Sequence, residues 1–128
     1  MGLNTNERKP ADISLADAYE HIRQWYSHSI PLLRQKMGDR DSAKKSAALI
    51  RALPPATQLS ELEIRAVLGE VIYGYLEWAF TQTDGKYKMA AYAKGALENA
   101  GLSWSINEEE KQKLKTSVLW PHLIINRQ

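Results

Sequence analysis

The chain has 128 residues, of which 44% are hydrophobic and 25% are charged, as in an ordinary globular protein of one domain. The absence of cysteine excludes disulfides, thiolate metal sites and cysteine nucleophiles. The aliphatic stretches are too short to span a membrane, and no secretory leader is recognisable. The sequence therefore predicts a cytoplasmic protein.

Residues 1–11 are short and polar, and we expect a flexible N-terminal leader followed by a single helical domain over residues 12–128. The first helix is predicted to follow Ser14, which can form a capping pair with Asp17. Apolar residues then recur at helical spacing, which indicates a surface helix with one buried face: Leu15, Ala18, Tyr19, Ile22, Trp25 and Tyr26.

Pro31 suits the first turn of a helix, so a kink and a new helix are predicted there, ending at Gly38. Asp41 is predicted to cap the next helix, over residues 42–52. Pro54 and Pro55 end it, because neither can donate a backbone hydrogen bond.

The segment 60–80 opens with a capping box formed by Ser60 and Glu63. Its helical pattern contains two apolar stripes on nearly opposite sides: Ile64, Val67, Leu68, Val71, Ile72, Tyr75 and Trp78 on one, and Leu62, Tyr73, Leu76 and Phe80 on the other. Only a line of glutamates at seven-residue spacing is expected to face water: Glu63, Glu70 and Glu77.

A helix with this pattern must be covered on more than one side, so it is either the central helix of the domain or half of a homo-oligomer interface. Gly69 and Gly74 destabilise a helix relative to alanine, which suggests close helix packing at these positions.

A hairpin at Asp84 and Gly85 is the rival interpretation of the next segment, but the alanine-rich stretch 86–99 favours a helix. Gly101 and Leu102 fit a left-handed C-cap with its apolar contact.

The last helix is predicted to begin near Ser105 or Asn107 and to place three glutamates at the positive end of its dipole. Its core face is thin, comprising Leu114, Val118 and Leu119, and Pro121 is expected to interrupt it. The predicted fold is thus all-α, a compact bundle of five or six helices around a central apolar helix, about residues 60–80.

The net charge of +2 is unevenly distributed. Residues 34–51 contain six basic and two acidic residues, a local net charge of +4. Residues 52–101 contain four basic and six acidic residues, a net charge of −2. A basic stretch beside a loop can contact phosphates or an acidic protein. The candidate partner- or phosphate-binding residues are Arg34, Lys36, Arg40, Lys44, Lys45 and Arg51.

No catalytic residue, metal ligand or cofactor is predicted. His21 and His28 lie two helical turns apart, about 10.5 Å along the axis, which is too far to share an ion directly. Asp17 and His21 could form an orienting pair, but no motif surrounds a nucleophilic serine. The glycines are scattered singly, so the sequence contains neither a phosphate-binding loop nor a dinucleotide fingerprint.

One stretch resembles a short helical segment in the small all-α subunits of CRISPR effector complexes, which line nucleic acid. The resemblance covers under a fifth of the chain and assigns no residue a role. It consists of Leu59, Ser60, Ile64, Arg65, Leu68, Val71 and Tyr75.

These patterns predict a non-enzymatic interaction protein, such as an adaptor, an inhibitor or a small subunit of a bacterial or phage assembly, that binds an acidic protein partner through the basic stretch. The alternative is a nucleic-acid-binding small helical subunit of a nucleoprotein complex. An enzyme acting through Asp17 and His21 is the third hypothesis.

Overall fold

The computed structural model describes residues 13–38, 40–73, 76 and 86–127, and all regular elements in these ranges are helical. The predicted leader, residues 1–11, lies outside them, as does the candidate hairpin at Asp84 and Gly85. The elements are α1 (Leu15–Met37), α2 (Asp41–Ala52), η2 (Ala56–Gln58), α3 (Glu61–Tyr73), α5 (Lys86–Asn99), α6 (Glu108–Leu114), η3 (Trp120–His122) and η4 (Ile124–Arg127).

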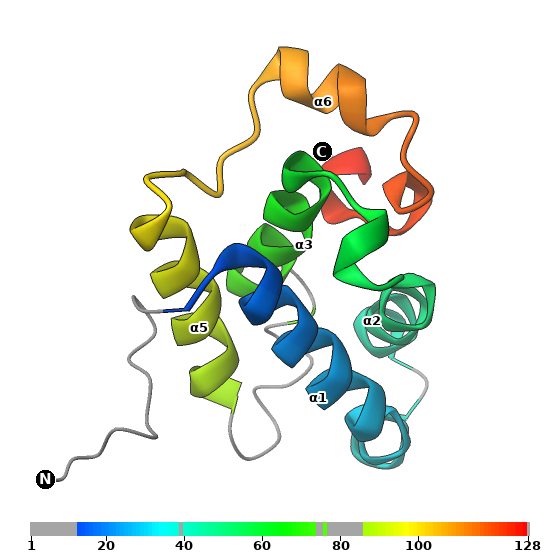
Figure 1. Ribbon diagram of the computed structural model, residues 1–128. Helices are drawn as coiled ribbons and strands as arrows, with labels where there is room; N and C mark the ends of the chain where they lie inside the picture. The colour runs from blue at the N-terminus through cyan, green and yellow to red at the C-terminus, as the bar shows by residue number, and fades with distance from the viewer. Residues whose placement is uncertain (1–12, 39, 74–75, 77–85, 128) are drawn as a thin grey trace, which may run out of the picture.

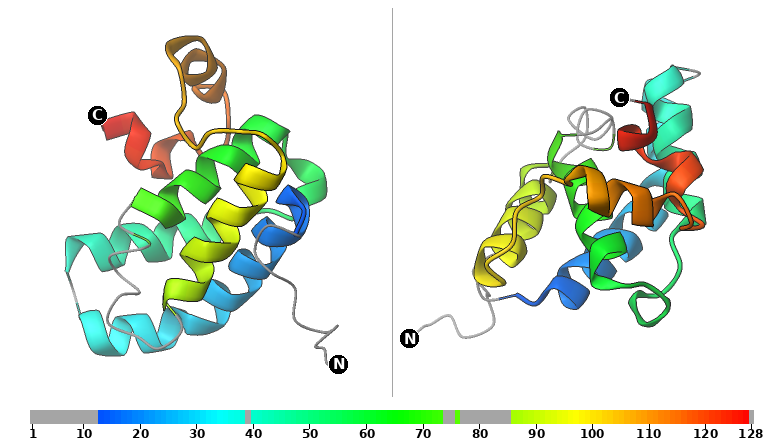
Figure 2. Two further views of the ribbon diagram at one scale, coloured as in Figure 1. Left: turned by 90° about the vertical axis from the view of Figure 1, so that its left-hand side faces the viewer. Right: turned by 90° about the horizontal axis from the view of Figure 1, so that it is seen from above.

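The helices pack into a compact arrangement in which α1 lies between α5 and α2 (Figure 1). α3 packs against α1, α5 and α6. Figure 2 shows α6 at one end of the molecule, with the C-terminal 3-10 helices beside α2 and α3. The all-α prediction is confirmed for the described part of the chain.

The predicted buried face of α1 forms a large part of the core. Ala18, Tyr19, Ile22 and Tyr26 are fully buried, and Leu15 and Trp25 pack at the edge of the core. The backbone N–H of Asp17 donates to Ser14 Oγ at 3.1 Å, as the capping pattern predicts. Burial raises the pKa of Tyr19, whose hydroxyl donates to the Pro54 carbonyl at 2.6 Å.

The predicted start of a new helix at Pro31 is wrong. α1 continues through Pro31 to Met37, and Gly38, with φ +62°, ends it. A proline inside a helix leaves the carbonyl four residues earlier without its usual donor. Here Ser27 and Pro31 are both exposed, so water can solvate that carbonyl and the helix persists.

α2 begins one residue earlier than predicted, because Asp41 is its first residue and Arg40 occupies the N-cap without a side-chain hydrogen bond. The helix ends at Ala52, before the two prolines, as expected. One side of the helix faces the core, where Ala43, Ala47, Ile50 and Leu53 are all buried.

The capping box of α3 is confirmed by two reciprocal hydrogen bonds. Glu63 N donates to Ser60 Oγ at 3.2 Å, and Ser60 N donates to Glu63 Oε1 at 2.9 Å. The apolar side chains described along this segment are buried or half-buried within the single chain: Leu62, Ile64, Val67, Leu68, Val71, Ile72 and Leu76. The predicted contributions of Tyr73, Gly74, Tyr75, Glu77, Trp78 and Phe80 lie outside the described side chains.

The C-cap predicted after α5 is confirmed. Gly101 has φ +70°, Gly101 N donates to the Glu98 carbonyl, and Leu102 N donates to the Leu97 carbonyl. This is the hydrogen-bond pattern of a Schellman motif. Leu102 also packs against the core.

α6 begins after Asn107, which forms a capping box with Glu110. The helix ends at Leu114, well before Pro121. Because the chain then enters a turn, Val118 loses its helical register with Leu114 and is 72% exposed. The prediction that Val118 belongs to the core is therefore wrong, whereas Leu114 and Leu119 are buried as expected.

None of the helices described is both long and apolar enough to cross a membrane.

Gly69 faces the segment between α5 and α6 rather than the flank of a helix. A Cβ atom at this position would lie 3.5 Å from the Trp104 carbonyl oxygen and 3.9 Å from Trp104 Cβ. Both distances are ordinary van der Waals contacts. The packing here is therefore not close enough to require glycine.

We expect Gly69→Ala to raise the free energy of unfolding by about 0.5–1 kcal/mol, because alanine is the better helix former and the space is sufficient. Urea denaturation followed by circular dichroism measures the change. A destabilised variant would show that the Trp104 backbone cannot accommodate the methyl group.

Candidate functional site

The basic stretch runs from the last turns of α1 through the N-cap of α2 and along α2 itself. Arg34 and Lys36 belong to α1, but their side chains lie outside the described part of the structure. Arg40 is exposed at the N-cap of α2. Lys44, Lys45 and Arg51 lie in α2, the helix on the right-hand side of Figure 1.

Two of these cations share one face of α2. Lys44 and Arg51 are seven residues apart, which corresponds to two turns and about 10.5 Å along the helix axis. Both are exposed. Within the described part of the chain, neither side chain forms a hydrogen bond or an ion pair. They form what we call the α2 cationic pair, Lys44 and Arg51.

Lys45 is separated from this pair. It follows Lys44 by one residue, which places it about 100° further round the helix. Its Nζ lies 2.6 Å from Asp41 Oδ2 in an i,i+4 ion pair. The structure therefore divides a stretch that looks uniformly basic in the sequence into a paired lysine and two cations without a described partner.

A small pocket of about 80 Å³ lies beside the α2 cationic pair. Its lining consists of Gly38, Ala43, Lys44, Ala47 and Arg51. Because Gly38 follows the last residue of α1, the pocket sits where α1 and α2 meet. Ala43 and Ala47 are buried, and their methyl side chains are too small to fill the pocket. The floor of the pocket is thus formed by small residues, and Lys44 and Arg51 each place a cation beside it from different turns of α2.

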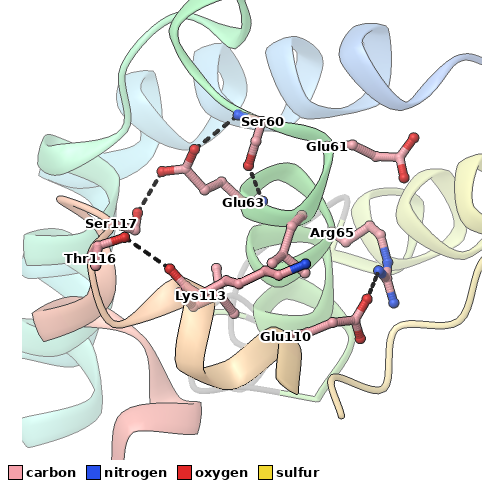
Figure 3. Close-up of a pocket in the computed structure, with 10 residues that line it drawn as sticks. Ser60, Glu61, Glu63, Arg65, Glu110, Lys113, Thr116 and Ser117 are labelled. Carbon is pink, nitrogen blue, oxygen red and sulfur yellow. Dashed lines mark hydrogen bonds and ion pairs between the residues drawn. The ribbon is translucent and has the colours of Figure 1, made fainter. Parts of the chain in front are cut away.

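A larger pocket of about 560 Å³ lies between the N-terminal end of α3 and α6 (Figure 3). Its polar side chains come from both elements and from the turn after α6: Ser60, Glu61, Glu63, Arg65, Glu110, Lys113, Thr116 and Ser117. Most of them contact one another. The chemistry that this pocket can offer depends on whether those contacts leave any group unoccupied.

Glu63 has both carboxylate oxygens engaged. Oε1 accepts from Ser60 N, and Oε2 accepts from the Ser117 hydroxyl at 2.6 Å (Figure 3). Partial burial raises the pKa of Glu63, but the hydrogen bonds from Ser117 and Ser60 outweigh it and hold the pKa below its ordinary value. Glu63 is therefore an anchor for the C-terminal segment.

Arg65 is a second anchor in the same pocket. Its guanidinium is buried and donates to the carbonyls of Ser103 and Ser105 and to Glu110 Oε2, the last at 2.6 Å. The hydrogen bond from Arg65 lowers the pKa of the Glu110 carboxyl. Arg65 therefore fixes the connection that leads from α5 to α6.

Glu20 and Glu70 hold two further segments in the same way. Glu20 Oε2 accepts from Ala56 N at 2.6 Å, and Glu70 Oε1 accepts from Ile124 N at 2.9 Å. Glu70 is only 6% exposed. The expectation that Glu63 and Glu70 belong to a solvated edge of the helix is therefore wrong, because both accept hydrogen bonds from the C-terminal segment.

The histidines form no metal site in the described residues, where no group of three metal-ligating side chains occurs. The His21 ring packs against Tyr92 in a tilted arrangement, with 4.9 Å between ring centroids. His28 Nδ1 lies 2.8 Å from the Gln24 carbonyl. His122 is half-buried in η3.

Comparisons of the chain with models of protein families, with curated proteins and with solved structures find no match. The functional interpretation accordingly rests on the residues and geometry described above.

Sequence analysis identified the basic residues but not the division among them. The seven-residue spacing of Lys44 and Arg51 was the available signal, since residues two turns apart share a face of a helix. The roles of Glu63 and Glu70 were missed because their partners lie 54 residues away in the sequence. A charged residue inside a nearly continuous apolar pattern, such as Glu70, was the available signal that a buried partner exists.

The hydrogen bonds of Glu63 should make the free energy of unfolding sensitive to acid. The folded-state pKa of Glu63 lies below the unfolded value of 4.5. Ionised Glu63 therefore stabilises the fold above about pH 4.5, and this contribution is lost as the pH falls through the folded pKa. We expect Glu63→Gln to lower the free energy of unfolding by about 1 kcal/mol at pH 7. The difference should shrink as the pH falls below 4.5.

Chemical denaturation between pH 3 and 7 measures this effect. Glu61→Gln is the matched control, because Glu61 is exposed two residues earlier on the same helix. If both variants show the same dependence on pH, Glu63 is not an anchor.

Replacing Arg65, the second anchor, should lower the free energy of unfolding by more than replacing Glu63. We expect Arg65→Met to lower the free energy of unfolding by about 2 kcal/mol, because three backbone or carboxylate acceptors lose a charged donor. Thermal and urea denaturation measure the loss. Glu110→Gln should cost less, since Arg65 keeps its two carbonyl acceptors; an equal cost would place most of the stabilisation in the ion pair.

Proposed function

We propose that the chain is a non-enzymatic interaction protein that binds an acidic protein partner through the α2 cationic pair, Lys44 and Arg51. The observation that supports this proposal most directly is the availability of two exposed cations on one helix face. Their side chains contact no described acceptor. The ammonium group of Lys44 and the guanidinium group of Arg51 can therefore bind an acidic surface without breaking a contact within the described part of the fold.

The other charged groups described in detail support the same choice by contrast. Glu20, Glu63, Arg65 and Glu70 are buried or half-buried, and each already holds a segment of the chain in place. Using any of them to bind a partner would first break a contact within the fold. The α2 cationic pair carries no such penalty.

An acidic protein surface fits this pair better than a nucleic acid does. Single-stranded binding draws its affinity from the number of phosphates neutralised, with a salt slope of about −0.7 for each. Two cations give a slope of about −1.4, or roughly sevenfold in affinity between 50 and 200 mM salt. That contribution is small for a nucleic-acid-binding subunit, so this function is the second candidate. Arg34 and Lys36 would have to contribute for it to apply.

The proposal includes the finer predictions made from the sequence. In it, the five described α-helices form a bundle around α3 as the central helix, residues 12–128 act as one domain, and the protein works in the cytoplasm. Arg40 lies at the N-cap of the same helix, whereas the charge of Lys45 is balanced by its ion pair with Asp41. Homo-oligomerisation through residues 60–80 is an alternative, although the described apolar side chains of α3 are at least half-buried within one chain.

We expect the double variant Lys44→Glu/Arg51→Glu to weaken binding to a glutamate-rich peptide by about tenfold or more at 100 mM salt, because attraction becomes repulsion at two positions. Fluorescence anisotropy with the labelled peptide measures the affinity, and a glutamine-for-glutamate peptide sets the background. Circular dichroism confirms that helicity is retained.

Lys45→Glu is the control, since it reverses one charge on the same helix at a lysine already paired with Asp41; the single variants Lys44→Glu and Arg51→Glu match it in charge. Lys45→Glu should weaken binding by less than threefold. Equal losses in Lys45→Glu and in these single variants would contradict a specific role for the pair. Tighter binding of a single-stranded oligonucleotide than of the peptide would favour the nucleic-acid alternative.

A further inference from the structure

The pocket beside the α2 cationic pair has dimensions and charge that restrict what can enter it. Its volume of about 80 Å³ admits one small group rather than a ring system or a whole side chain of large size. Among the described residues that line it, the charged ones are Lys44 and Arg51, and none is a carboxylate. The floor is made by the small residues Gly38, Ala43 and Ala47.

We propose that this pocket binds a phosphomonoester group, so that the acidic partner is a protein segment phosphorylated on serine, threonine or tyrosine. This inference rests on the proposed function, because it names the chemical group recognised by the same two cations. A phosphomonoester carries a charge of about −1.5 to −2 at pH 7, which matches the two positive charges of Lys44 and Arg51. A single carboxylate or a phosphodiester carries only one negative charge.

The side chains are of the types that recognise phosphate. Arginine presents several N–H donors in a planar fork that fits a phosphate, and lysine supplies a compact, strongly hydrated charge on a flexible stem. Because both side chains line the same pocket from positions two turns apart, a tetrahedral group between them can accept from both. The alanine floor lets the phosphate oxygens approach the helix without a steric obstacle.

One feature opposes the anion. α1 ends at Met37, next to Gly38 in the pocket lining, and the C-terminal end of a helix carries a partial negative charge of about half a unit. The two full positive charges of Lys44 and Arg51 exceed this partial charge. The pocket lies beside the middle of α2, where the dipole of that helix has little effect.

The test is an NMR titration of the ¹⁵N-labelled full chain with N-acetyl-phosphoserine amide. We expect the largest shifts at the amides of Ala43, Lys44 and Ala47, and a dissociation constant about fivefold higher for Lys44→Gln and for Arg51→Gln. Lys45→Gln, the matched control about 100° further round α2, should change the dissociation constant by less than twofold.

Two further probes separate the monoester from other anions. Between pH 5 and 7.5 the affinity for the monoester should rise about tenfold, because its second pKa is near 6. Dimethyl phosphate and acetate should bind more weakly and show no such rise. Equal affinity for all three probes, or shifts of equal size at the lysines of α6, would overturn the inference.

A pair of peptides distinguishes this inference from the proposed function. If a phosphoserine peptide binds no better than the same peptide with glutamate, yet Lys44→Glu/Arg51→Glu weakens both, the phosphate inference fails and the proposed function stands. If neither peptide binds the unchanged protein, yet the free monoester shifts the Ala43 and Ala47 amides and Lys44→Gln or Arg51→Gln raises its dissociation constant, the proposed function fails and the phosphate inference stands.

Discussion

The architecture depends on one kind of hydrogen bond. A glutamate carboxylate or an arginine guanidinium on α1 or α3 pairs with a polar group of a segment that connects the helices. Backbone groups in short connections cannot pair within a helix, and they destabilise a fold when they are buried without a partner. Three residues of α3, namely Glu63, Arg65 and Glu70, supply partners to the chain after α5. Glu20 of α1 does the same for the connection after the two prolines.

This constraint explains why α3 contains charged residues despite its apolar surroundings. Ile64, Val67, Leu68 and Val71 are almost completely buried, and they bring α3 into contact with α1 and α5. The buried charges between them would destabilise the helix if they had no partners. Each has one, and that partner belongs to a segment distant in sequence.

The sequence predicted the features that are local. The capping box at Ser60, the left-handed C-cap at Gly101 and the buried face of α1 all depend on residues within one or two turns of each other. The contacts of Glu63 and Glu70 with residues 54 positions away follow from the packing of the whole chain, and no local pattern encodes them. The candidate site was half predictable: its residue types were evident, whereas the pairing of Lys45 with Asp41 and the pocket beside Lys44 and Arg51 required coordinates.

The attachment of the C-terminal segment has a consequence for the dynamics of the molecule. Residues 115–127 are joined to α3 by two carboxylate contacts, and η3 packs against α2. Leu119 and Leu123 are buried, and the segment contains only short 3-10 helices. Such a segment can open as a cooperative unit at a lower free energy than global unfolding. Its amide protons would then exchange with solvent earlier than those of α1 and α3, and transient opening would expose leucine surface to proteases while α1 and α3 stay folded.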